Sequence, residues 1–229
     1  MDTSTSNLFM KLQIKIRNKF ASNNFKRKPY SKVEFCYATD HEKKIISYKI
    51  RYSSYFSHGY IPINPDRLWY DKFDSMDSTK IILVSNESHY FATIRFCTSY
   101  TSEKISQIPS LEIFDLDYQK LKNLFPSSKG LYDHYKITEI SKFAISINYQ
   151  MKNDAIFSVY NASVKVIEEI NPDVIIISVR KNHINFYKKM GFLIINEEKY
   201  FKKDNVWLSL MGCSAQHFKL IEITENYTI

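Results

Sequence analysis

Residues 137–147 have the sequence Ile-Thr-Glu-Ile-Ser-Lys-Phe-Ala-Ile-Ser-Ile, and the fold is worked out from this stretch. Its β-branched residues predict a strand over Ile137 to Ile147, with a carboxylate, Glu139, on it. An amphipathic helix over Asp154 to Ile170 is expected next. The apolar run Asp173 to Val179 is then typical of a strand buried on both faces.

The elements on either side extend this pattern. Asp40 is a candidate N-cap for a helix over His41 to Ser57, and a polar connection follows it over Ile61 to Ser78. The other predicted elements are strands over Val33–Tyr37, Lys80–Ser85, Tyr90–Thr98, Phe192–Ile195 and Val206–Leu210, and helices over Ser110–Phe125 and Asn182–Met190. This order predicts an α/β fold with a mixed β-sheet flanked by helices on both faces.

The composition favours a single domain. The chain has 229 residues, 44% of them hydrophobic, with 4 glycines and no linker-like stretch between two halves. We expect a domain over residues 31–212, preceded by a basic amphipathic segment over residues 1–30. Residues 213–229 are expected to form a C-terminal extension.

The basic residues are concentrated at the N-terminus. The net charge is +8, and seven Lys and Arg residues stand against Asp2 alone in the first thirty positions. Leu8, Leu12, Ile16 and Phe20 recur every four residues, which favours a helix, although Leu12, Ile14 and Ile16 also alternate as on a strand. A solvated segment, a nucleic acid, an anionic membrane and an acidic protein are all compatible with such an arm.

The expected location is cytoplasmic. No stretch reaches the roughly 20 apolar residues that span a bilayer. The cysteines Cys36, Cys97 and Cys213 are sparse and odd in number, which is typical of a reducing compartment. The basic N-terminus leaves open a peripheral contact with the inner face of the membrane.

Several classes of function lack their motifs. The six histidines do not have zinc-binding spacing, so no metal site is expected. There is no GxSxG nucleophile elbow and no glycine-rich nucleotide loop. The signatures of nucleic-acid-binding modules are missing as well, so we expect no nucleic-acid partner.

Four segments together resemble one enzyme family. They are Tyr48-Lys49-Ile50-Arg51-Tyr52; Tyr70-Asp71-Lys72-Phe73-Asp74 with the following Thr93-Ile94-Arg95-Phe96; Thr138 to Ile145; and Asn185 to Phe192. In this order they resemble the autoinducer-synthase-like branch of the GNAT acyltransferases. That branch contains acyl-homoserine-lactone synthases and long-chain N-acyl amino acid synthases. The resemblance runs from about Val33 to Leu210.

Each segment also has a structural explanation. Arg51, Asp71, Asp74 and Arg95 alone could form a surface ion network that contributes little. Glu139 could be a hydrogen-bonded structural carboxylate, and the aromatic pair before Gly191 could simply pack beneath a helix end. The combined pattern favours the enzyme.

The resemblance implies the roles of the site residues. Glu139 is the expected general base, because burial can raise the pKa of a carboxylate, and Ser141 joins it in the catalytic set. Backbone N–H groups between Ser141 and Phe143 would bind the oxyanion. The remaining expected residues bind substrate, and they are Arg51, Tyr55, Asp71, Asp74, Arg95 and Lys142.

The sequence departs from the family pattern in two places. Ordinary acetyl-CoA enzymes of this fold have a glycine-containing pyrophosphate loop, whereas Asn148 to Ala155 contains no glycine. This argues against tight binding of a CoA pyrophosphate and agrees with the donor that the resemblance implies, an acyl group on the phosphopantetheine of an acyl carrier protein. Acyl-CoA is the weaker candidate, and no other cofactor is expected. The second departure is Lys142, where the lactone synthases usually have Arg.

Three functions follow in order of preference. Gly59-Tyr60 after the first helix resembles the N-acyl amino acid synthase branch, whose acceptor is the α-amine of an amino acid. The first alternative is an acyl-homoserine-lactone synthase that uses S-adenosylmethionine. The second is a non-catalytic acyl-binding or membrane-surface module, against which the intact Glu139 argues.

Overall fold

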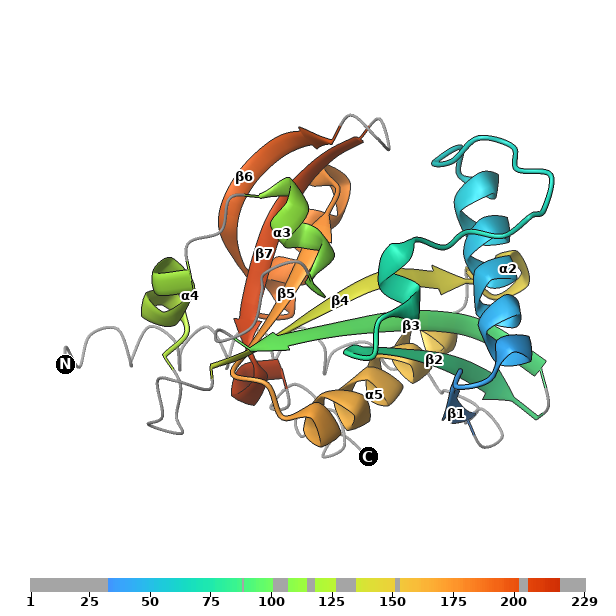
Figure 1. Cartoon of the computed structure of the whole chain (residues 1–229), viewed down its shortest axis with the longest axis horizontal. Coiled ribbons are helices and arrows are strands. Elements are labelled where there is room, and N and C mark those ends of the chain that lie inside the picture. The colour runs from blue at the N-terminus through green and yellow to red at the C-terminus, as the bar shows by residue number, and fades with distance from the viewer. Residues whose placement is uncertain are drawn as a thin grey trace, which may run out of the picture.

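A computed structural model describes residues 33–87, 89–100, 107–114, 118–126, 135–150, 153–201 and 206–218. Within these ranges the chain forms one seven-stranded sheet covered by helices (Figure 1). The predicted basic segment 1–30 lies outside the described residues, as does the end of the predicted extension 213–229. None of the helices in the described ranges is both long enough and apolar enough to cross a membrane.

The sheet is mixed. Its strand order is β1-β2-β3-β4-β5-β7-β6, in which β4 and β5 are parallel and the other neighbours are antiparallel. Helix α5 (Asn153–Ile170) makes the crossover that a parallel pair requires. The strands are β1 (Val33–Tyr37), β2 (Thr79–Asn86), β3 (His89–Tyr100), β4 (Lys136–Ile145), β5 (Val174–Val179), β6 (Leu193–Phe201) and β7 (Val206–Ser214).

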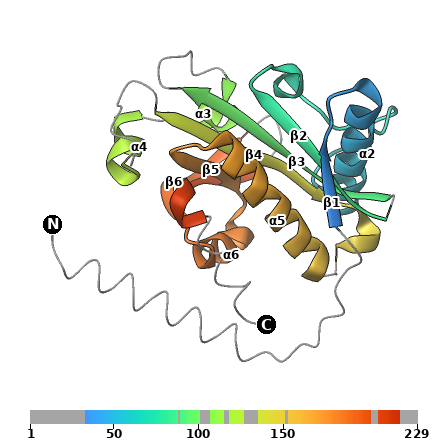
Figure 2. The same cartoon turned by 90° about the horizontal axis from the view of Figure 1, so that it is seen from below.

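Helices cover both faces of the sheet (Figures 1 and 2). One face carries α2 (His41–Ser57), the 3-10 turn η1 (Lys72–Ser75), α3 (Pro109–Ile113) and α4 (Tyr118–Leu124). The opposite face carries α5 and α6 (Ile184–Lys189). Two further 3-10 turns are η4 (Ile147–Tyr149) and η5 (Lys181–His183).

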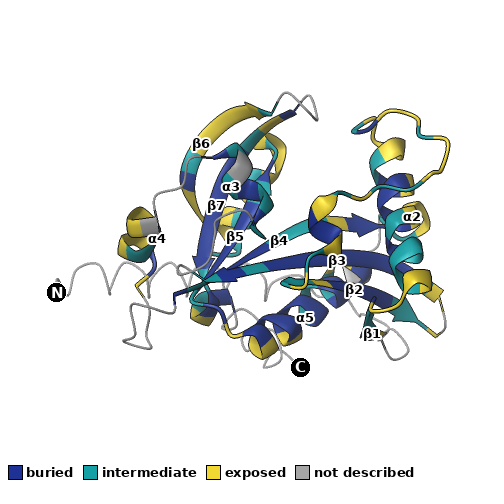
Figure 3. Cartoon of the chain, viewed as in Figure 1, coloured by how far each residue is buried: buried dark blue, intermediate teal, exposed yellow. Residues whose placement is uncertain are grey.

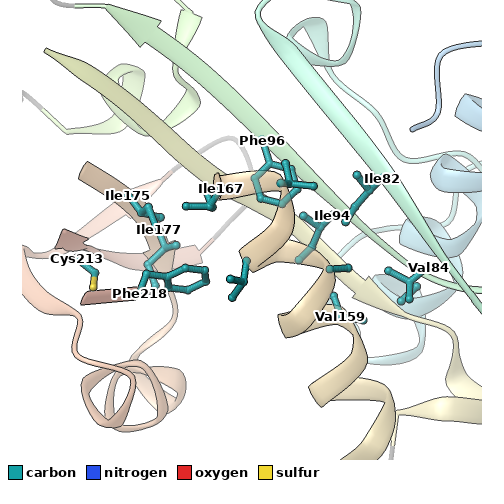
Figure 4. Close-up of a cluster of buried hydrophobic side chains, with 14 of the residues drawn as sticks. Ile82, Val84, Ile94, Phe96, Val159, Ile167, Ile175, Ile177, Cys213 and Phe218 are labelled. Atoms are coloured by element: carbon teal, nitrogen blue, oxygen red, sulfur yellow. The ribbon is translucent and has the colours of Figure 1, made fainter. Parts of the chain in front are cut away.

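Alternating side chains supply the two cores. Along β2, Ile82 and Val84 pack toward α5, while Ile81 and Leu83 pack toward α2. Figure 4 shows Val159 and Ile167 of α5 among the sheet residues of the first core. The central strands are therefore buried on both sides, and exposed residues collect on β6 and on the outer sides of the helices (Figure 3).

The sheet splits between its two parallel strands. β4 and β5 pair only over Ile137–Val174, Thr138–Ile175 and Glu139–Ile176. Beyond Glu139, β4 stays paired with β3 and β5 stays paired with β7, so the two strands diverge (Figure 1). We call this opening the fork, and Glu139 lies at its closed end.

The predicted α/β class, with a mixed sheet and helices on both faces, is confirmed, as are the bounds of α2. The single helix predicted over Ser110–Phe125 is wrong. Phe114 takes an extended conformation, and its ring is buried in the core, so α3 ends at Ile113 and α4 begins at Tyr118.

The C-terminal strands are longer than predicted. The strand expected over Phe192–Ile195 extends to Phe201, because it pairs along β7 with exposed, charged residues that carry no apolar pattern. β7 runs to Ser214, so the domain boundary predicted after residue 212 falls inside this strand. Phe218 packs into the core against α5.

Candidate active site

Helix α2 supplies the first site residues, Arg51 and Tyr55. Asp40 caps the helix, with its side chain accepting the Lys43 N–H at 2.8 Å. The helix then packs Ile50 onto the sheet. Arg51 follows Ile50 on the buried side, and its side chain has no exposed surface.

The turn η1 positions Asp71 and Asp74. Asp71 accepts the Phe73 N–H at 3.0 Å, and Asp74 Oδ2 accepts the Asp71 N–H at 2.8 Å. This reciprocal capping fixes both carboxylates with respect to the backbone. Asp71 Oδ1 also pairs with Arg95, and the remaining oxygen of Asp74, Oδ1, pairs with Arg51.

These side chains form one buried ion cluster. Arg51 Nη1 lies 2.6 Å from Asp74 Oδ1. Arg95 Nη1 lies 2.5 Å from Asp71 Oδ1 and 3.2 Å from Asp74 Oδ2. Both arginine side chains are at most 1% exposed, so the surface-network explanation does not hold. The cluster ties α2 and η1 to β3.

The cluster extends onto β4. Arg95 Nε donates to Ser141 Oγ at 3.1 Å, and Lys142 Nζ lies 3.3 Å from Asp71 Oδ2. Lys142 also lies over the Trp69 ring, 5.5 Å from its centroid. Burial alone would raise the pKa of Asp71, but the charges of Arg95 and Lys142 outweigh it and hold that pKa at about 2. Asp71 is therefore an anion at neutral pH.

A β-bulge in β4 falls next to the fork. The register with β3 shifts between Thr93–Ala144 and Arg95–Ser141, and Lys142 has a positive φ of 52°. Such a bulge turns backbone groups out of the regular ladder. The predicted oxyanion-binding stretch, Ser141 to Phe143, is this bulge.

Glu139 is 2% exposed and lies on the same face of the sheet as the ion cluster. Its Oε2 accepts the N–H of Ser110, in the first turn of α3, at 2.7 Å. Burial raises the pKa of Glu139, opposed by the hydrogen bonding of Ser110 and by the charges of Arg95 and Lys142. A raised pKa is what a carboxylate needs to act as a base near neutral pH.

Two residues of this site were not predicted from the sequence. The Ser110 hydroxyl lies 2.7 Å from the Ser178 hydroxyl, across the fork from β4. Ser110 is 29 residues from Glu139, and no spacing rule connects them. One signal was available: Pro109 marks a helix start, where the N–H groups of the first turn have no partner within the helix.

Tyr55 connects α2 to the bulge. Its hydroxyl donates to the Phe143 carbonyl at 3.2 Å, and burial raises its pKa to about 12. The predicted substrate-binding residues are therefore linked to the bulge beside the fork, directly or through one another. Glu139 lies at the closed end of the fork. Whether each residue acts on a substrate as expected stays a prediction.

The sequence matches one protein family. The family described as N-acyl amino acid synthase FeeM matches residues 47–214. No curated protein matches the chain.

Solved structures with the same fold include enzymes of both expected branches. FeeM, an N-acyl amino acid synthase from uncultured soil microbes, superposes with a TM-score of 0.63 at 16% identity, covering 82% of this chain and 92% of its own. The acyl-homoserine-lactone synthase LasI gives a TM-score of 0.57 at 13% identity, covering 81% and 91%. The CoA-dependent synthase BjaI, solved with SAM and isopentyl-CoA, gives 0.57 at 11%, covering 86% and 88%.

Proposed function

This chain belongs to the FeeM family of N-acyl amino acid synthases and is an N-acyltransferase, and we propose that it moves a long-chain acyl group from an acyl carrier protein to the α-amine of an amino acid. The observation that carries the proposal is the position of Glu139. A buried carboxylate with a raised pKa lies at the closed end of a fork in the sheet. A thioester and an amine that enter the fork would react beside it.

The reaction needs one proton acceptor. The attacking amine must be neutral, and Glu139 takes its proton directly or through a water molecule. The nitrogen then bonds to the thioester carbonyl carbon. When the resulting tetrahedral intermediate collapses, the C–S bond breaks and the leaving sulfur takes up a proton, which gives an amide and the free thiol of the carrier.

Ser110 holds the base in place. Its N–H binds one oxygen of Glu139, which leaves the carboxylate anchored at a fixed position. The same bond favours the ionised form and so limits how far burial raises the pKa. The pKa of Glu139 therefore stays low enough for the protonated side chain to release its proton in each cycle.

The bulge at Lys142 would bind the oxyanion. The ladder between β4 and β5 ends at Glu139, and the bulge turns backbone groups out of the ladder with β3, so backbone N–H groups there would face a ligand in the fork. Donors that are already oriented stabilise developing negative charge without reorganisation. The ion cluster contributes by fixing this backbone, since Arg95 holds Ser141 and Asp71 holds Lys142.

Two features of the sequence support an acyl carrier protein as the donor of the acyl group. Tight binding of a CoA pyrophosphate by a glycine-rich loop is unsupported here, because residues 148–155 lack glycine. Carrier proteins are acidic, and a chain of net charge +8 would attract them. The basic segment 1–30 is the proposed source of this attraction, and also of any peripheral contact with an anionic membrane.

A second candidate function comes from the fold shared with LasI and BjaI. In that case the acceptor would be S-adenosylmethionine and the product an acyl-homoserine lactone. The family match favours the N-acyl amino acid synthase, and we therefore rank the lactone synthase second.

The test is an assay of the purified full-length chain with long-chain acyl carrier protein and a pool of the twenty amino acids, read by mass spectrometry. One dominant N-acyl amino acid is expected, with at least roughly a hundredfold less of it from the Glu139→Gln variant. A parallel reaction with S-adenosylmethionine in place of the pool detects lactone synthesis. If neither reaction gives an acylated product, the proposal is wrong and the non-catalytic alternative stands.

A further inference from the structure

A pocket of about 530 Å³ lies at the open end of the fork. It is bounded by the loop after α2, by the turn after β5 and by strands β6 and β7. Its lining residues are Tyr60, Arg180, Lys181, Asn182, Glu198, Val206 and Trp207. The volume is in the range of small-ligand sites, and the three segments come from both sides of the fork.

Arg180 has a fixed orientation in this pocket. Its guanidinium stacks on the Tyr60 ring, 3.8 Å from the ring centroid. In the part of the chain that the structure describes, neither Arg180 nor Lys181 forms an ion pair, and Lys181 is exposed. Stacking fixes the plane of a guanidinium and leaves its N–H edge free, which is the arrangement that binds a phosphate or carboxylate.

The distance of Arg180 and Lys181 from Glu139 follows from their positions just past the end of β5. Ile176 pairs with Glu139, and Arg180 follows four residues later. At the rise of a β-strand this is ~13 Å. The carboxylate of an α-amino acid is attached to the same carbon as the reacting amine, so an acceptor at Glu139 would not reach this far.

The phosphate of the donor arm fits the separation. The phosphopantetheine chain between thioester and phosphate is comparable in length to about four extended residues, or ~14 Å. Its thioester at Glu139 would therefore place its phosphate near Arg180. The charge fits as well, since Arg180 and Lys181 against Glu198 leave one positive charge, which matches the single charge of a carrier-linked phosphodiester.

We propose that Arg180 and Lys181 bind the phosphate of the donor's phosphopantetheine arm. This inference rests on the proposed function, because it assumes a phosphopantetheine donor. It assigns to two side chains after β5 the role that a glycine-rich backbone loop after β4 would otherwise have. Tyr60 is a positioning residue, since it holds the guanidinium toward the pocket.

The test compares two donors that differ only in the phosphate: an acyl-pantetheine and the matching acyl-4′-phosphopantetheine thioester. The wild-type protein should have the lower KM for the phosphorylated donor. In Arg180→Ala that KM should rise about tenfold to a hundredfold, as expected for a lost charge-assisted hydrogen bond, with no change for acyl-pantetheine. Arg180→Lys, which keeps the charge, should fall between the two.

The matched control is Lys188→Ala, which removes an exposed cation of α6 outside the pocket and should change neither KM. An Arg180→Ala variant that raises the KM of both donors equally would overturn the proposal. So would an effect confined to the KM of the amino acid, which would assign the pocket to the acceptor.

A binding measurement separates this inference from the proposed function. Calorimetry with the full-length protein should show that free 4′-phosphopantetheine binds more tightly than pantetheine, and that Arg180→Ala removes the difference. Failure of acyl transfer from every donor would refute the proposed function alone. Equal binding of the two compounds to the wild-type protein would refute the phosphate site, whatever the activity.

Discussion

Arg51 Nη1 and Asp74 Oδ1 lie 2.6 Å apart, and neither side chain has any exposed surface. This pair fastens η1 to α2, and the Asp74 carboxylate also reaches Arg95. Two further donors of Arg51, Nε and Nη2, are buried and have no hydrogen-bond partner among the residues that the structure describes. Arg51 therefore depends on Asp74 for the compensation of its charge.

Removing that carboxylate should be costly. Asp74→Ala leaves the Arg51 guanidinium buried and unpaired, and we expect the free energy of unfolding to fall by about 3–5 kcal/mol. Urea denaturation measures the change. The control is Lys80→Ala, since the Lys80–Glu169 pair is about half exposed and 3.8 Å long; its midpoint should stay close to wild type. Equal shifts for the two variants would contradict the importance of burial.

Glu139→Gln should remove turnover without unfolding the protein. The amide oxygen can still accept the Ser110 N–H, but the side chain cannot take up a proton. We expect kcat to fall by roughly 10²–10⁴-fold, the usual contribution of a general base. Acyl-transfer kinetics and a denaturation curve of the same preparation provide the measurement. A variant with wild-type kcat would exclude Glu139 as the base.

The same substitution should stabilise the protein, in a pH-dependent way. Burial raises the pKa of Glu139, so the folded state holds this proton more tightly than the unfolded state. The stability that Glu139 contributes is complete at acid pH and is lost as the pH rises through its folded-state pKa. We expect Glu139→Gln to be more stable than wild type at pH 8, with the difference vanishing toward pH 4. Denaturation at both values checks the sign.

Gly191 should not tolerate a side chain. Its φ is +83°, and a Cβ built there would lie 2.0 Å from His217 Nε2. The free energy of unfolding of Gly191→Ala should therefore fall by about 1–2 kcal/mol because of the left-handed backbone, and by a further amount because of the contact with His217. In the double variant, His217→Ala should restore only the stability that was lost through this contact. If the double variant is no more stable than Gly191→Ala, the contact contributes nothing.

The sequence predicted the elements whose patterns are local. α2 has a cap at Asp40 and a stop near Gly59, and its bounds were correct. α5 has a strong apolar stripe that ends at Asn171-Pro172. The residues of the ion cluster were also predicted, because they lie in segments whose order along the chain resembles a known enzyme family.

The rest depends on contacts between distant segments. The extended conformation of Phe114 comes from burial of its ring, and the length of β6 comes from pairing with β7. The bond from Ser110 to Glu139 and the stacking of Arg180 on Tyr60 join residues that no local pattern relates. The fork follows from how far β4 and β5 pair, and nothing in the amino-acid composition predicts where this pairing ends.

The fork also gives the middle of the sheet the character of an edge strand. Past Glu139, the side of β4 that faces β5 has backbone groups without a strand partner, as at the margin of any sheet. In a hydrogen-exchange experiment, some amides of residues 140–145 should therefore exchange as quickly as those of a margin, although they lie at the centre of the domain. Proteins usually protect such edges against unwanted pairing, and the reaction that we propose requires this one to remain open.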